Sequence, residues 1–179
     1  IWVPANFRQT PEDVAWLAAS SGAKGLLAGA EFADHIAACD GVAFTVTIGG
    51  AGDDDYDALV AAYAASTVTA AVVGRDDPAW FFFTSGTTGK PKAAVLTHGQ
   101  MAFVVTNHLC DLMPGTGPDD ASIVVAPLSH GAGIHQLTQV AHGVKTILPG
   151  GTKFDAAEVW RLIAQWRVTN AFTVPTIVK

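Results

Sequence analysis

Nine consecutive residues, Thr84 to Lys92, combine four hydroxyl groups, two glycines and two lysines. Glycines let a backbone approach a ligand closely and turn its N–H groups towards it. Hydroxyls donate hydrogen bonds, and lysines supply compact positive charge. This combination suits a polyphosphate, whereas a polar hairpin turn, the alternative, needs only one or two special residues. We therefore interpret this stretch as a phosphate-binding loop.

The spacing differs from that of the common nucleotide-binding P-loop. A P-loop places four residues between its first glycine and a Gly-Lys-Ser/Thr sequence at the start of a helix. Here two residues separate Gly86 from Gly89, and Pro91 stands where serine or threonine would be. Strand-like apolar runs lie on both sides, at 79–83 and 93–97. Spacing and context therefore disfavour a P-loop kinase or GTPase.

The loop resembles the signature phosphate loop of the adenylate-forming (AMP-binding) enzymes, which include acyl-CoA synthetases, luciferases and peptide-synthetase adenylation domains. Thr97 and His98 also follow the pattern of that family. Two positions differ, because Ala93 stands where the family usually has glycine and Gln100 where it usually has asparagine. Alanine is tolerated at position 93 if the local φ is negative.

The similarity extends over essentially all 179 residues. Val124 to His130 resembles the second core motif of the family, a strand that ends in Pro-Leu before an aromatic residue or histidine. Residues 3–6 and 20–24 fit the segment before the loop. Phe154-Asp155 and residues 168–176 follow the order of the family. The phosphate loop is the specific part of this resemblance, and the other matches gain weight from their order.

The resemblance implies an AMP-forming acid–thiol ligase, most like an acyl-CoA synthetase. In such enzymes ATP and a carboxylate form an acyl-adenylate and pyrophosphate, and CoA then displaces AMP to give a thioester. ATP, Mg²⁺ and CoA are therefore the expected cofactor and co-substrates. The expected substrate is a small-molecule carboxylic acid, and we expect a fatty acid.

The resemblance also implies roles for individual residues. The phosphate-binding set would be Thr84, Ser85, Gly86, Thr87, Thr88, Gly89, Lys90 and Lys92. Lys92 and His130 would be catalytic, and Thr84 would contact Mg²⁺. The substrate pocket would comprise His130, Gly131, Ala132 and Gly133. His130 could instead cap the next helix or bond the backbone, and the small residues that follow it could form a tight turn rather than leave room for an acyl chain.

The class within the family can be narrowed. Peptide-synthetase adenylation domains usually have serine where this loop has Thr87, and their second motif carries an aspartate that pairs with the amino group of the substrate. Residues 129–131 offer no acid, and an unpaired ammonium would be costly to bury. An acyl-CoA synthetase is therefore favoured. An acyl-AMP ligase acting with a carrier protein and a non-catalytic, anion-binding fragment stay open as alternatives.

The later motifs of the family are absent from this sequence. They carry the adenine-binding aromatic residue, a Mg²⁺-binding glutamate, the ribose-binding aspartate and a further catalytic lysine. We therefore expect a fragment of the large N-terminal domain that is inactive alone and that packs against the remainder of its parent chain. Apolar faces that await those partners could also drive homo-oligomerisation.

Composition excludes several other functions. The net charge is −6 without a basic stripe, which argues against binding nucleic acid or an anionic membrane surface. The uncharged run 58–74 is too short and too weakly apolar for a membrane span. Cys39 and Cys110 lack metal or disulfide spacing and predict reduced thiols in a cytoplasmic protein. No signal peptide is evident.

Strand-like and helical segments alternate, which predicts an α/β fold of layered parallel sheets flanked by helices. The expected strands are 25–28, 42–48, 79–83, 93–97, 121–126, 144–148 and 169–174. The expected helices are 11–21, 32–39, 56–66, 100–112, 134–141 and 154–166. The Pro/Gly-rich segment 114–120 predicts a linker. It would separate a lobe at 1–114, which carries the phosphate loop, from a lobe at 115–179, which carries the substrate-side motif.

Overall fold

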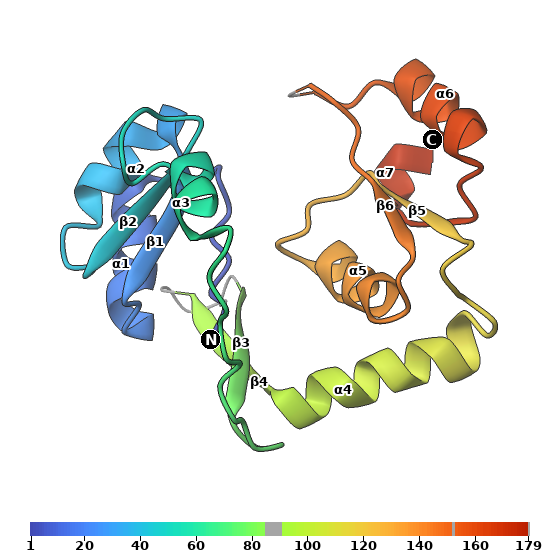
Figure 1. Ribbon diagram of the computed structural model, residues 1–179, viewed down its shortest axis with the longest axis horizontal. Helices are drawn as coiled ribbons and strands as arrows, with labels where there is room; N and C mark the ends of the chain where they lie inside the picture. The colour runs from blue at the N-terminus through green and yellow to red at the C-terminus, as the bar shows by residue number, and fades with distance from the viewer. Residues whose placement is uncertain (85–90, 152, 179) are drawn as a thin grey trace. The chain divides into compact units, whose positions relative to one another are not determined.

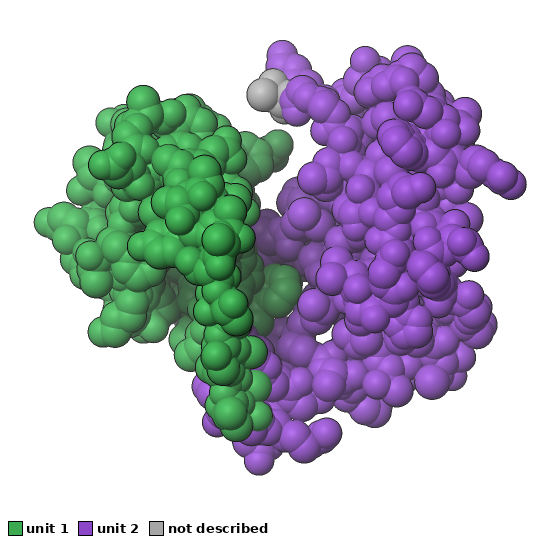
Figure 2. All heavy atoms as spheres, viewed as in Figure 1, with its two compact units in different colours: residues 1–73, 80–95 green, residues 74–79, 96–179 purple. Residues whose placement is uncertain are grey.

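The computed structural model describes residues 1–84, 91–151 and 153–178. The chain folds into two compact units, which Figure 2 shows in different colours. Unit 1 comprises residues 1–73 and 80–95, and unit 2 comprises residues 74–79 and 96–179. The boundary expected between residues 114 and 115 lies inside unit 2. The division of the intact enzyme into lobes at that point stays a prediction.

Unit 1 contains a pair of strands, β1 and β2, which lie side by side in Figure 1. They are parallel, and Gly25 is in register with Phe44. Its strands and helices are α1 (Pro11–Ser21), β1 (Gly25–Gly29), η1 (Ala30–Phe32), α2 (Ala33–Ala38), β2 (Phe44–Ile48) and α3 (Tyr56–Tyr63). Helix α1 begins as predicted, because the Thr10 Oγ1 accepts a hydrogen bond from the Asp13 N–H at 3.2 Å. It ends at Gly22, whose φ of 65° is readily available to glycine.

The strands on either side of the phosphate loop form a sheet of their own. β3 (Pro78–Thr84) pairs with β4 (Lys92–Thr97), separately from β1 and β2. The part of the chain that we expected to form the first lobe therefore contains two separate pairs of strands, β1–β2 and β3–β4. A parallel bridge between Trp2 and Trp80 links the N-terminus to β3. Residues 67–73 are exposed and irregular.

Unit 2 is a three-stranded parallel sheet with the strand order β6–β5–β7. Its strands are β5 (Ala121–Val124), β6 (Lys145–Ile147) and β7 (Asn170–Phe172). Its helices are α4 (His98–Asn107), the π-helix η2 (His108–Leu112), α5 (Gly131–Ala141), α6 (Ala156–Trp166) and α7 (Pro175–Val178). The predicted alternation of strands and helices around parallel sheets is confirmed. The short helix α7 was not predicted.

One face of the sheet in unit 2 is apolar and packs against α6. Ile123 and Ile147 from the sheet meet Val159 and Leu162 from the helix, and each of the four is buried. Helix α6 begins two residues after the predicted start at 154, because Asp155 is its N-cap and the carboxylate accepts hydrogen bonds from the Ala157 and Glu158 N–H groups. This cluster is the hydrophobic core of unit 2.

The opposite face of the same sheet is polar and packs against α5, which lies across the sheet from α6 (Figure 1). Side chains alternate along a strand, so Ser122 turns away from the α6 side that Ile123 occupies. Ser122 is in register with Thr146 on one neighbour and with Asn170 on the other. From α5 this row meets buried polar side chains at helical spacing, namely His135, Gln136 and Gln139. The helix was predicted, but its polar buried face was not.

Candidate functional site

Two residues of the phosphate loop lie at the ends of paired strands. Thr84 ends β3, Lys92 begins β4, and the Thr84 hydroxyl donates a hydrogen bond to the Lys92 carbonyl oxygen at 3.5 Å. Both residues are exposed. Strand pairing thus holds the two ends of the loop together and leaves the Lys92 side chain in solvent. The other predicted phosphate ligands, Ser85 to Lys90, lie outside the described residues.

Aromatic side chains anchor the strand that leads into the loop. The Phe83 ring packs edge-on against the Trp16 ring of α1, with centroids 6.2 Å apart. Trp80 and Phe82 pack against each other with ring centroids 5.9 Å apart. These contacts involve long, rigid side chains that bury much apolar area. They fix β3 immediately before Thr84.

The strand that leaves the loop runs directly into α4, which begins two residues earlier than predicted. The Thr97 Oγ1 accepts from the Gln100 N–H at 3.2 Å, and the Gln100 side chain accepts from the Thr97 N–H at 2.9 Å. This reciprocal pair is a capping box and starts the helix at His98. Gln100, which departs from the family pattern, therefore has a structural role here. The sequence Thr-x-x-Gln was a signal that we overlooked.

His130 lies at the N-cap of α5, shortly after the carboxyl end of β5. Its carbonyl oxygen accepts from the Gly133 N–H at 2.9 Å, so the backbone of His130 takes part in the first turn. Within the described residues its side chain makes no capping hydrogen bond to that turn, and the residue is exposed. A catalytic role for His130 stays a prediction.

The three small residues after His130 form the first turn of α5. Ala132 is buried, with 4% of its surface exposed. The space beside Gly131 is occupied by an aromatic ring, because a Cβ atom on this glycine would lie 2.7 Å from the Cζ atom of Phe172. The part of Gly131, Ala132 and Gly133 in a substrate pocket stays a prediction.

Sequence reasoning missed a hydrogen-bonded group beside this turn. Asn170 on β7 has its Oδ1 atom 3.1 Å from the Nε2 atom of His135, and its Nδ2 atom donates to the Gln139 Oε1 at 3.2 Å. Phe172, two residues further along β7, has its ring centroid 6.1 Å from that of His135. Asparagine is depleted in strands, so Asn170 in an otherwise β-forming run was the available signal.

His135 is a buried histidine whose neutral form is favoured. Removal from water lowers the pKa of the imidazole, and the nearby His108 lowers it further, while the hydrogen bond to Asn170 acts in the opposite direction. The His108 and His135 rings lie 6.3 Å apart between centroids. Protonation of His135 would therefore place a charge in a buried layer beside a second histidine.

We expect acidification to destabilise unit 2 through His135. Its folded-state pKa is below the ordinary value of 6.5, so the unfolded chain binds more protons. The stabilising contribution of the neutral ring is present above pH 6.5 and is lost as the pH falls from there towards the folded-state pKa. Urea unfolding at pH 7.5 and 5.5 should show a smaller decrease in stability for His135→Gln than for the parent. Equal decreases would exclude His135 as the source.

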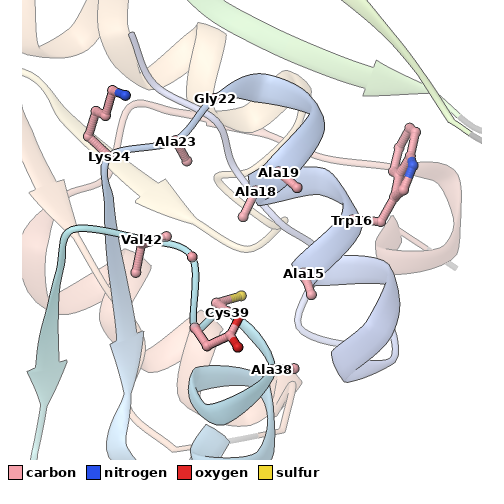
Figure 3. Close-up of a pocket in the computed structure, with 12 residues that line it drawn as sticks. Ala15, Trp16, Ala18, Ala19, Gly22, Ala23, Lys24, Ala38, Cys39 and Val42 are labelled. Carbon is pink, nitrogen blue, oxygen red and sulfur yellow. The ribbon is translucent and has the colours of Figure 1, made fainter.

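Unit 1 also contains a cavity of about 470 Å³, at the side of α1 (Figure 3). Ala15, Ala18 and Ala19 of α1 line it, together with residues 22–24 and the turn at 38–42. The Cys39 sulfur lies between α1 and α2 in this view. None of the described residues that we predicted for the phosphate or substrate site lines this cavity.

We expect Cys110 to react with thiol reagents before Cys39. Cys39 is 4% exposed, and burial and the neighbouring Asp40 carboxylate both raise the pKa of its thiol. Cys110 is exposed, and the thiolate is the reactive form. Limited alkylation followed by intact mass spectrometry should give a first adduct that Cys110→Ser abolishes and Cys39→Ser retains. The reverse pattern would contradict the burial of Cys39.

Comparison with known proteins places the chain in a family. The AMP-binding enzyme family matches residues 1–179. A feruloyl-CoA synthase from Amycolatopsis sp. is 34% identical over 185 residues, covering 99% of this chain and 34% of that protein. The N-terminal domain of FACL13 from Mycobacterium tuberculosis, solved with an inhibitor, superposes with a TM-score of 0.78 at 28% identity, covering 98% of this chain and 44% of that one. ATP-bound MatB from Rhodopseudomonas palustris gives 0.77 at 26% identity, with 99% and 35% covered.

The chain therefore belongs to the family of AMP-binding enzymes. Its fold of parallel sheets and helices is that of the N-terminal domains of adenylate-forming enzymes. The chain spans about a third of the length of curated relatives that match almost all of it. Within the described residues, no helix is both long enough and apolar enough to cross a membrane.

Proposed function

We propose that this chain is part of an AMP-forming acid–CoA ligase. The observation that carries the proposal is the paired end of the phosphate loop, where the exposed Lys92 and the Thr84 hydroxyl lie on adjacent strands in a chain of the AMP-binding family. A primary ammonium and a hydroxyl fit the oxygen-rich surface of a polyphosphate. A hydroxyl oxygen also suits Mg²⁺, so Thr84 fits the proposed metal contact.

The proposed reaction has two steps. A carboxylate oxygen of the acid attacks the α-phosphorus of ATP, the bond to the β-phosphate breaks, and pyrophosphate leaves. The CoA thiol, on losing its proton, then attacks the acyl carbon, and the bond to AMP breaks to give a thioester. Negative charge gathers on the leaving phosphates in the first step, where a fixed cation stabilises the transition state. Lys92 would supply this cation, together with the loop from Ser85 to Lys90.

We assign the acid side of the reaction to His130 and to the three residues after it. His130 lies at the N-cap of α5, shortly after the carboxyl end of β5, and the residue is exposed. It would meet the substrate carboxylate, and residues 131–133 would line the pocket. A side chain at the end of a parallel strand suits this task, because ligands bind at that edge of α/β sheets.

We expected a fatty acid as the substrate, but the names of related proteins include several other kinds of acid. Curated relatives are named for ferulate, indoleacetate and medium- or long-chain fatty acids. The relatives that match almost the whole of this chain are named for ferulate and 4-coumarate, which are aromatic acids. We therefore propose an aromatic acid as the first substrate to test, with a fatty acid as the alternative.

The other partners follow from the same proposal. CoA is the proposed acceptor, and a carrier protein is the alternative. The remainder of the parent chain would complete the active site. We also propose that the enzyme is cytoplasmic and that it can form homo-oligomers. Activity would require the full-length enzyme rather than this segment alone.

The test is ATP–pyrophosphate exchange by the full-length enzyme with ferulate, with octanoate and without acid. We expect exchange that depends on an acid, and thioester formation when CoA is added. Exchange without thioester formation would favour the carrier-protein alternative. Absence of exchange with a broad panel of carboxylic acids would overturn the proposal.

A further inference from the structure

The strand β7 presents two side chains to α5 from the same face. Asn170 and Phe172 are two residues apart, so both turn towards the helix. Asn170 bonds to the second and third turns of α5 through His135 and Gln139, and Phe172 packs on Gly131 in the first turn. A single strand thus fixes the helix along most of its length. None of these contacts lies within the phosphate loop.

We infer that Phe172 and Asn170 are positioning residues that hold the first turn of α5, and with it His130, in place for the reaction. The inference rests on the proposed role of His130. Phe172 acts on the peptide that directly follows His130, because its ring occupies the space where a side chain of residue 131 would lie. Asn170 sets the rotation and depth of the helix behind that turn.

The geometry at Gly131 is tight. A Cβ atom there would lie 2.7 Å from the Phe172 Cζ atom and 3.3 and 3.4 Å from its Cε1 and Cε2 atoms. The three nearest contacts are thus with the far end of the ring. The start of the helix cannot move towards β7 without striking the ring, and the ring fills the space that would otherwise let the turn shift.

The contact between Phe172 and Gly131 is important because the rest of the interface between α5 and the sheet is different in kind. The layer between α5 and the sheet consists mostly of polar groups, which act through specific pairs rather than through general apolar packing. Asn170 contributes two of these pairs, and a third joins Gln136 to Thr146 on β6. At the first turn, where His130 begins the helix, the aromatic ring supplies the contact.

The first experiment uses the full-length enzyme. It adds a methyl group at position 131 and shortens the side chain at position 172. In a helical turn alanine is normally preferred to glycine, so Gly131→Ala should not weaken the helix through its backbone propensity. With the ring present, we expect Gly131→Ala to lower kcat/KM for acid-dependent pyrophosphate exchange by about tenfold or more. Phe172→Leu removes the three ring atoms that the new methyl group would meet, so Gly131→Ala/Phe172→Leu should recover most of this loss. A double variant as impaired as Gly131→Ala would overturn the inference.

The second experiment tests whether Phe172 acts through His130. Phe172→Ala should lower kcat with little change in the KM for ATP, and it should have almost no further effect in a His130→Ala background. If the fold-losses in kcat of Phe172→Ala and His130→Ala multiply in the double variant, the inference is overturned, whereas the role of His130 is left intact. Unchanged exchange in His130→Ala itself would overturn both. Thermal unfolding of each variant, with Phe172→Leu as the conservative change, separates lost stability from lost positioning.

Asn170 provides an independent readout. Asn170→Asp keeps the size and the oxygen acceptor opposite His135 but removes the Nδ2 donor to Gln139. It also introduces a carboxylate, which would raise the pKa of His135. We expect the pH profile of exchange to shift to higher pH in this variant. Asn170→Ser, which shortens the side chain, should instead lower kcat at every pH. Identical pH profiles for the parent and both variants would contradict the positioning role of Asn170.

Discussion

Replacing Lys92 with alanine in the full-length enzyme should slow acid-dependent ATP–pyrophosphate exchange by about 100-fold or more. The physical reason is that a fixed cation stabilises charge that develops on the leaving phosphates, and this charge is larger in the transition state than in bound ATP. Lys92 begins β4 and is tied through its carbonyl oxygen to the Thr84 hydroxyl. Its backbone is therefore held while its exposed side chain can reach a ligand.

The acid should bind the Lys92→Ala variant almost as well as the parent, because the assigned role concerns the phosphates. Equilibrium binding of the acid and exchange rates should be measured on the same preparations. Lys153→Ala is the matched control, since Lys153 is also exposed but lies before α6 and far along the chain from the loop. Parent-like exchange in Lys92→Ala, or an equal loss in Lys153→Ala, would refute the assigned role.

The second large effect is a difference in unfolding free energy between alanine variants of two adjacent residues of β5. Ile123→Ala should lower the free energy of unfolding by about 2 to 5 kcal/mol, because it opens a cavity in the core against α6. Ser122→Ala should be neutral or stabilising. Ser122 is fully buried, and within the described part of the chain its hydroxyl has no hydrogen-bond partner. Removing such a group relieves the cost of keeping it away from water.

Urea unfolding of the chain, monitored by circular dichroism, measures both changes under one set of conditions. The pair is a matched comparison, since both side chains are almost completely buried on the same strand and face opposite helices. A large loss for Ser122→Ala would mean that its hydroxyl is hydrogen-bonded in solution, for instance to a buried water. A small loss for Ile123→Ala would contradict the core described for unit 2.

The elements that sequence alone predicted are those with local signals. Thr10 and Asp155 carry the N-cap chemistry that starts α1 and α6, and Gly22 supplies the left-handed residue that ends α1. Apolar runs of β-branched residues marked β2 and β5. The separate pairing of β3 with β4 could not be predicted, because neighbouring strands are chosen by tertiary packing rather than by local propensity.

Residues of the candidate site were likewise predicted only where the sequence carries a local signal. The phosphate loop was evident because its nine residues are consecutive, and His130 was evident from the motif around it. Asn170 and Phe172 were missed because their partners on α5 lie 31 to 41 positions earlier in the chain. The residue pattern within a single helix or strand does not indicate a contact between segments that are so far apart in the sequence. Their importance becomes visible only when the register of β7 against β5 is known.

The two faces of the sheet in unit 2 should differ in how freely their residues can be exchanged over evolutionary time. On the α6 side, aliphatic residues of similar volume can replace one another, because that face needs only to be filled. On the α5 side, His135, Gln136 and Gln139 each have a particular partner on the sheet, so a change at one position calls for a matching change at another. Among relatives, positions 135, 139 and 170 should therefore vary together, whereas positions 123, 147, 159 and 162 should drift independently among Ile, Leu, Val and Met.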